Sequence, residues 1–161
     1  MDNEVSVKAL SEEELHKIEL YVNDKFRNGA GFNCSQVVSS YFAEQYGIDG
    51  DIIKKISCGF GGGMRKGEVC GAVTGGIMTV GMKYGACNIN DADGKASCYS
   101  KTVQFEDAFM EKEGSVLCRD LLKCDISTPE GYSFAKENGL FPKICPKMIL
   151  TAIATLKELG Y

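Results

Sequence analysis

Apolar residues recur at helical spacing through most of the chain. In the segment 11–27 they stand three or four positions apart, and Ser11 with Glu14 forms a capping-box pattern in front of them. We therefore expect an N-terminal helix over 11–27. Asn33 is a candidate cap for a second helix, and Gly47 is placed to end it. Capping residues and periodicity thus agree on the first two elements.

The same periodicity predicts helices along the rest of the chain. The glycine-rich stretch 59–67 and the turn-rich stretch 85–95 predict loops. Strand signals are weak, because no stretch combines apolar–polar alternation over five or more positions with β-branched enrichment. A lone two-stranded ribbon stays open. The expected further helices cover 51–57, 69–84, 96–112, 115–123 and 146–160, with one short helix after the turn at 127–131.

These elements predict an all-α fold, a single-domain helical bundle of about six to eight helices with a glycine-rich loop. The predicted domain covers 1–161, with the N-terminal helix 11–27, a cysteine-motif core over 33–147 and the C-terminal helix 146–160. Helical period also places four side chains of the helix 96–112 in the core. They are Tyr99, Val103, Phe105 and Phe109.

Composition and charge narrow the classes of function. Hydrophobic residues make up 44% and charged residues 25% of the 161 residues, which suits one globular domain. The net charge is −4, and no basic patch favours nucleic acid as a partner. The longest apolar run, 69–82, contains four glycines and two threonines and is too short for a membrane span. Since the N-terminus also lacks an apolar leader, we expect a cytoplasmic protein with no membrane partner.

Eight cysteines are the unusual feature of the composition. Cytoplasmic thiols are normally reduced, so we expect no static disulfide framework. Four cysteines stand at predicted helix N-termini, where unpaired N–H groups and the helix dipole stabilise a thiolate. We therefore expect lowered pKa values and convergence on a common site, although burial as small apolar residues is the alternative. The four are Cys34, Cys70, Cys118 and Cys145, the last a candidate N-cap in front of Pro146.

Other side chains carry weaker signals. Cys58 stands beside the glycine run and is a candidate for the same cavity. Cys124 follows Cys118 by six residues, so it faces the same site only if the helix ends first. His16 is the only histidine and lies on an acidic helix, which argues against a Cys–His dyad or a His-rich zinc site. Three cations would strengthen a thiolate site if they face inward, namely Arg65, Lys66 and Arg119.

The glycines favour close packing over phosphate binding. The pattern GFGGGM at 59–64 matches neither GxGxxG nor a P-loop, and no strand precedes it. Gly71 and Gly75 share a helix face, which allows another helix or an inorganic cofactor to approach, and both options stay open. The candidate cofactor-binding glycines are Gly61, Gly62, Gly63 and Gly71.

Five short motifs resemble one known family. They are NCSQ at 33–36, GFGGGM at 59–64, CGAVTG at 70–75, CRDLL at 118–122 and ICPK at 144–147. Together they resemble the C_GCAxxG_C_C family of redox-active proteins over most of the chain. The resemblance implies a helical, bacterial or archaeal, cytoplasmic protein whose four characteristic cysteines correspond to Cys34, Cys70, Cys118 and Cys145. A similar segment in a multihaem cytochrome with an iron–sulfur centre favours a cluster, although Cys58, Cys87, Cys98 and Cys124 leave the ligand set open.

Three functions are compatible with these cysteines. The first is a redox protein whose four thiolates are both the catalytic residues and the metal ligands of an iron–sulfur cluster, most simply 2Fe–2S, used for electron transfer. The second is a metal-free thiol–disulfide oxidoreductase or redox sensor. The third is a structural module with an all-cysteine zinc site. Each redox function requires an unidentified redox partner protein, and the sequence leaves room for a homodimer.

Overall fold

Helices make up nearly all regular structure in residues 8–161, the part of the chain that the computed structural model describes. The all-α expectation is confirmed for this part, and residues 1–7 of the expected domain 1–161 lie outside it. Short helical turns join several of the longer helices. The α-helices are α1 (Glu12–Phe26), α2 (Cys34–Ala43), α3 (Gly50–Ser57), α4 (Gly71–Tyr84), α5 (Ala92–Glu113), α6 (Cys118–Leu122), α7 (Pro129–Glu137) and α8 (Leu140–Glu158).

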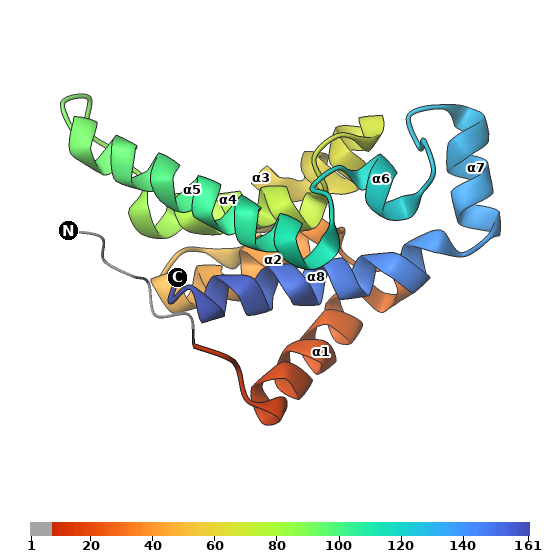
Figure 1. Cartoon of the computed structure of the whole chain (residues 1–161), viewed down its shortest axis with the longest axis horizontal. Helices are drawn as coiled ribbons and strands as arrows, with labels where there is room; N and C mark the ends of the chain where they lie inside the picture. Colours follow the sequence, from red (N-terminus) through yellow and green to blue (C-terminus); the bar gives the residue numbers. More distant parts are fainter. Residues whose placement is uncertain (1–7) are drawn as a thin grey trace.

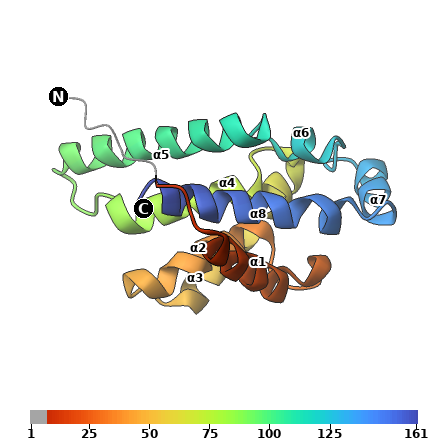
Figure 2. The ribbon, with the colours of Figure 1, turned by 60° about the horizontal axis from the view of Figure 1, so that its bottom comes forward.

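Helix α8 is the axis of the bundle. It runs between α1 on one side and α4 with α5 on the other, while α2 packs against both α4 and α8 (Figures 1 and 2). Helix α7 meets the start of α8 at 87° and lies at the far end of the molecule from the loop that precedes α5 (Figure 1). Because α8 has neighbours on several sides, most of its residues from Met148 to Leu156 are buried.

Capping explains where the first helices begin. Ser11 accepts a hydrogen bond from the N–H of Glu14, and the Glu14 carboxylate accepts one from the N–H of Ser11. Asn33 and Gln36 form the same reciprocal pair at the start of α2. Gly47, in the left-handed region with φ of 68°, follows the helical turn that continues α2. The sequence-based starts of both helices are therefore confirmed.

Three predicted boundaries were wrong. Helix α5 begins at Ala92 within the predicted loop 85–95, because the Asp91 side chain accepts a hydrogen bond from the N–H of Gly94 and caps the helix early. Helix α8 begins at Leu140 rather than at Pro146, because the apolar period already starts there. The predicted glycine loop is not an open loop, since it contains a helical turn at Cys58–Phe60 and a π-helical turn at Gly63–Gly67.

Only half of the predicted inner face of α5 is buried. Phe105 and Phe109 are fully buried, as expected. Tyr99 and Val103 are 62% and 55% exposed, so their placement in the core was wrong. The helix packs against α4 and α8 along one face, and nothing within the described residues covers the other. The ribbon that the sequence left open is reduced to one antiparallel bridge, between Val69 and Leu117.

No single helix in residues 8–161 is long and apolar enough to cross a bilayer, and only α7 and α8 taken together across their bend meet the criterion.

Candidate functional site

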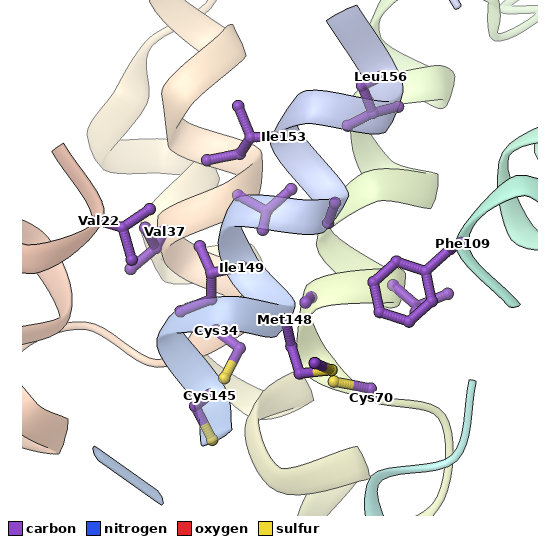
Figure 3. Close-up of a cluster of buried hydrophobic side chains, with 14 of the residues drawn as sticks. Val22, Cys34, Val37, Cys70, Phe109, Cys145, Met148, Ile149, Ile153 and Leu156 are labelled. Carbon is purple, nitrogen blue, oxygen red and sulfur yellow. The ribbon is translucent and has the colours of Figure 1, made fainter. Parts of the chain in front are cut away.

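The four cysteines that the sequence singled out line one cavity of about 600 Å³. They come from four different helices or helix starts, in α2, α4, α6 and α8. Figure 3 shows the sulfurs of Cys34, Cys70 and Cys145 at the same end of the bundle core. All eight cysteines of the chain are free thiols, and each of these four is at most 9% exposed. The fold therefore gathers thiols that lie far apart in the sequence.

Glycine in the CGAVTG motif brings α4 close to α2. A Cβ atom added at Gly71 would lie 3.1 Å from the Cβ of Cys34, and one added at Gly75 would lie 2.7 Å from the carbonyl oxygen of Ser35. Side chains at these positions would push the two helices apart. Cys70, which directly precedes Gly71, is thereby held beside the helix that carries Cys34. The close-packing option for this glycine face is the one that the structure shows.

Cys70 and Cys118 are placed together by the short antiparallel bridge. The N–H of Cys70 donates to the carbonyl of Val116 at 2.8 Å, and the N–H of Cys118 donates to the carbonyl of Glu68 at 2.7 Å. Arg119 reinforces this junction through an ion pair with Glu68. Each cysteine then starts a helix, Cys70 as the N-cap of α4 and Cys118 as the first residue of α6.

Cys145 reaches the cavity in a different way from the other three. It lies inside α8, five residues after its start, so the expectation that it caps a helix in front of Pro146 was wrong. Pro146 has no N–H, so the carbonyl of Pro142 lacks its usual helical partner. Pro142 and Cys145 both border the cavity. The turn of α8 that lacks a backbone hydrogen bond is therefore the turn that borders the cavity.

The thiols of Cys34 and Cys145 affect each other's titration. Interaction with the Cys145 thiol raises the pKa of Cys34 well above its ordinary value, and burial and the charges of Cys145, Cys70 and Cys118 raise it further. Interaction with the Cys34 thiol lowers the pKa of Cys145, against the opposing effect of burial. The pair thus consists of one thiol that loses its proton more readily and one that keeps it.

The other two thiols do not have the lowered pKa values that their helix starts predicted. Burial raises the pKa of Cys70 to about 11, although the backbone N–H groups of Ala72 and Val73 partly oppose it. Burial raises the pKa of Cys118 to about 12. Desolvation of the charged form therefore outweighs the helix terminus at both sites. Cys70 and Cys118 remain protonated thiols at neutral pH.

The remaining sequence candidates separate into those at the cavity and those away from it. Gly61, Gly62 and Gly71 line the cavity, whereas Gly63 packs against the backbone of Glu68 and does not. Cys58 is exposed and lines the cavity, as the sequence suggested. Three cysteines lie elsewhere: Cys124 donates to the carbonyl of Gly131, Cys98 packs on the core and Cys87 is exposed in a loop.

Two cationic side chains, Arg65 and Lys136, line the cavity, and only Arg65 was a candidate from the sequence. Of the three candidates Arg65, Lys66 and Arg119, only Arg65 lines the cavity. Lys136, on α7, lines it as well and carried no signal in the sequence. Its position follows from the 87° turn between α7 and α8, which periodicity alone does not reveal.

The four cavity cysteines are the possible donors of a metal centre. Four thiols with access to one cavity match the ligand number of an iron–sulfur cluster. As they lie, however, no group of three or more cysteine, histidine, aspartate or glutamate side chains in residues 8–161 is arranged to hold one metal ion. The arrangement that the described side chains do present is the Cys34–Cys145 pair.

Comparison with known proteins agrees with the motifs. No curated protein and no solved structure matches the chain. The family described as "Putative redox-active protein (C_GCAxxG_C_C)" matches residues 32–159, which include all four cavity cysteines of the motifs and the helices that carry them. The protein therefore belongs to the C_GCAxxG_C_C family of redox-active proteins.

Proposed function

We propose that the protein is a thiol–disulfide oxidoreductase or redox sensor in which Cys34 and Cys145 alternate between a dithiol and a disulfide. The observation that carries the proposal is that Cys34 and Cys145, both buried, line the same cavity, and each thiol shifts the pKa of the other. Two neighbouring thiols on one cavity wall are placed to form a disulfide. The lowered pKa of Cys145 supplies the thiolate that such chemistry requires.

The proposed cycle uses a disulfide, from a small molecule or a partner protein, as the oxidant. The Cys145 thiolate attacks one sulfur of that disulfide and releases the other as a thiolate, which leaves a mixed disulfide. Cys34 then loses its proton and attacks the Cys145 sulfur, which releases the second thiolate. The Cys34–Cys145 bond has formed, the external disulfide has gained two electrons, and the two released thiolates take up the protons.

The remaining thiols have supporting roles in this proposal. Cys70 and Cys118, with pKa values of about 11 and 12, stay neutral and provide a polarisable wall without adding charge to the pair. Their raised pKa values also keep them from competing with Cys145 as nucleophiles. A compartment that keeps thiols reduced, such as the cytoplasm, suits this cycle because it regenerates the dithiol.

A titration of free thiols tests the proposed pair. We expect mild oxidation of the reduced wild-type protein by a small disulfide to remove two of its eight thiols, and reductant to restore them. Cys34→Ser and Cys145→Ser should each abolish the paired loss. Cys124→Ser is the matched control, because Cys124 lies outside the cavity, and it should retain the loss of two. Reversible oxidation that survives in Cys34→Ser and Cys145→Ser would refute the assignment.

An iron–sulfur protein is the second candidate, favoured by the presence of four thiols on one cavity. Cys34, Cys70, Cys118 and Cys145 would hold the cluster, which supplies one-electron transfer when bound. Iron and acid-labile sulfide analysis of protein prepared without oxygen separates the two candidates. Stoichiometric iron and sulfide that are lost in Cys118→Ser would favour the cluster, because Cys118 is not part of the proposed dithiol.

A further inference from the structure

The mouth of the cavity has an uneven distribution of charge. Arg65 and Lys136 line it, and no aspartate or glutamate within residues 8–161 does. The chain as a whole carries a net charge of −4, so a cavity with two cations and no acid departs from the average surface. Neither Arg65 nor Lys136 takes part in an ion pair within residues 8–161.

Arg65 is held in place by two features of the fold. Its guanidinium carbon lies 4.1 Å from the centre of the Tyr132 ring, so the cation is stacked on a second cavity residue. Its backbone has a φ of 61° and follows Met64, at 53°, and two left-handed glycines. Consecutive left-handed residues cost conformational energy, and such conformations concentrate at ligand sites. The charge is thus held at the cavity by a costly local conformation.

The rest of the cavity wall is mainly apolar. Aromatic rings and aliphatic side chains of α1, α6 and α8, with the Phe32 ring, surround the thiols. A volume of about 600 Å³ lies within the range of sites that bind small organic molecules. The wall residues that a ligand body would contact are Phe26, Phe32, Leu121, Phe141 and Ile144.

We propose that this cavity binds a small organic anion, with its apolar body against the aromatic wall beside the thiols and its acidic group between Arg65 and Lys136. The inference rests on the proposed function, because the same cavity would then present the ligand to the Cys34–Cys145 pair. It narrows the small-molecule oxidant or reductant of that cycle to molecules with a negative charge. Electrostatic attraction between an anion and the two cations in a largely apolar cavity supplies the selectivity.

Binding of anilinonaphthalene sulfonate, followed by its fluorescence, tests this inference. Phenylnaphthylamine has the same ring system without the sulfonate and is the neutral control ligand. We expect one sulfonate per folded chain, bound more tightly than the neutral compound, with an affinity that falls as salt is added. Equal affinities for the two compounds would overturn the inference.

Two variants and a control variant test which cationic side chains bind the sulfonate. Arg65→Gln and Lys136→Gln should each weaken sulfonate binding roughly threefold to tenfold. Lys66→Gln, which removes an exposed charge from the same turn but outside the cavity, should change it less than about twofold. Lys136 lies on the regular helix α7, so its variant tests the charge without disturbing the strained turn. A loss in Lys66→Gln as large as in Arg65→Gln would overturn the assignment.

The cysteines provide a second readout. Bound sulfonate should slow the alkylation of Cys58, which is exposed at the cavity, and leave Cys87, which is exposed in a distant loop, unchanged. Titrations on a Cys34→Ser, Cys145→Ser double variant separate binding from redox chemistry. Charge-selective binding to this variant supports the inference even if the wild-type protein shows no reversible oxidation. Oxidation of wild type without charge-selective binding overturns the inference and leaves the proposed function intact.

Discussion

The two halves of α8 have opposite surroundings. In the second half, Ile149, Ile153 and Leu156 are completely buried among α1, α2, α4 and α5. In the first half, Cys145 and Met148 border the cavity, and Figure 3 shows the labelled sulfurs gathered there while the aliphatic side chains continue along the helix. One continuous helix therefore has a filled core at one end and a sulfur-lined cavity at the other.

The backbone differs between these two ends as well. Around the core end the helices are regular, whereas the cavity end contains Pro146 inside α8 and the left-handed run from Gly62 to Arg65. Regular helices pack densely because their side chains interdigitate. Irregular segments leave space and orient backbone groups and charges toward it. The filled core therefore stabilises the bundle, while the irregular end is free to hold reactive groups.

The largest effect should come from removing core volume at the filled end. Ile153→Ala should lower the free energy of unfolding by about 2–5 kcal/mol, because it leaves an enclosed void. Met148→Ala should cost less than about 2 kcal/mol, since it enlarges a cavity that already exists. Urea unfolding of both variants under reductant measures the difference. Equal losses would show that the two ends are packed alike.

Two glycines of α4 distinguish the effect of a tight helix–helix contact on stability from the effect of helix propensity. Gly75→Ala should destabilise by about 1–3 kcal/mol, because its Cβ would lie 2.7 Å from the Ser35 carbonyl oxygen. Gly81 lies in the same helix with nothing within 4 Å, so Gly81→Ala should instead stabilise by up to about 1 kcal/mol. Thermal melts of the two variants check the opposite signs. A stabilising Gly75→Ala would contradict the close approach of the helices.

Alkaline pH should weaken the cavity end through its buried thiols. The pKa of Cys70 rises from its ordinary value of 9.0 to about 11 in the folded state. The folded state then holds the proton more strongly, so stability is constant below pH 9 and falls as pH rises toward 11. Between pH 8 and 10 this single thiol should remove about 1 kcal/mol.

The matched measurement compares the wild-type protein with Cys70→Ala by urea unfolding at both pH values under reductant. The loss of stability on going to the higher pH should be about 1 kcal/mol smaller in Cys70→Ala. Tyrosines with raised pKa values are common to both proteins and cancel in the comparison. Identical pH dependence in the two proteins would mean that Cys70 is not desolvated.

The smallest effect should come from the surface ion pair beside the cavity. Glu68 and Arg119 are 50% and 37% exposed, so Glu68→Gln should cost less than about 1 kcal/mol and the loss should shrink in high salt. Chemical unfolding at two salt concentrations measures it. The backbone bonds that join Cys70 and Cys118 remain, so thiol oxidation should be unchanged. A large change in oxidation would show that this pair positions the thiols.

Local signals in the sequence predicted much of the fold. Ser11 and Asn33 cap the helices that they were expected to cap, because capping depends on side chains within three residues. The shared location of the four cysteines was also predictable from the motifs and from helix starts, although Cys145 arrives in the middle of a helix. The helical spacing of apolar residues before Pro146 indicates the start of α8 better than the proline does.

The errors concern properties that depend on tertiary contacts. Whether Tyr99 is buried depends on which side of α5 packs against another helix, and the spacing of apolar residues does not determine that side. The pKa of Cys70 depends on depth of burial, which overrides its helix start. The mutual influence of the Cys34 and Cys145 thiols joins residues more than one hundred positions apart, so no local pattern encodes it.

Mapping the disulfide by peptide mass after mild oxidation is the sharpest test of the proposed Cys34–Cys145 disulfide. Oxidised and reduced samples would be alkylated at low pH, digested and compared for cross-linked cysteine peptides. The account predicts one new linkage, between Cys34 and Cys145, that disappears with reductant, while Cys70, Cys118 and Cys124 stay alkylatable after unfolding. A reversible linkage that joins any other two cysteines, or no linkage at all, would contradict it.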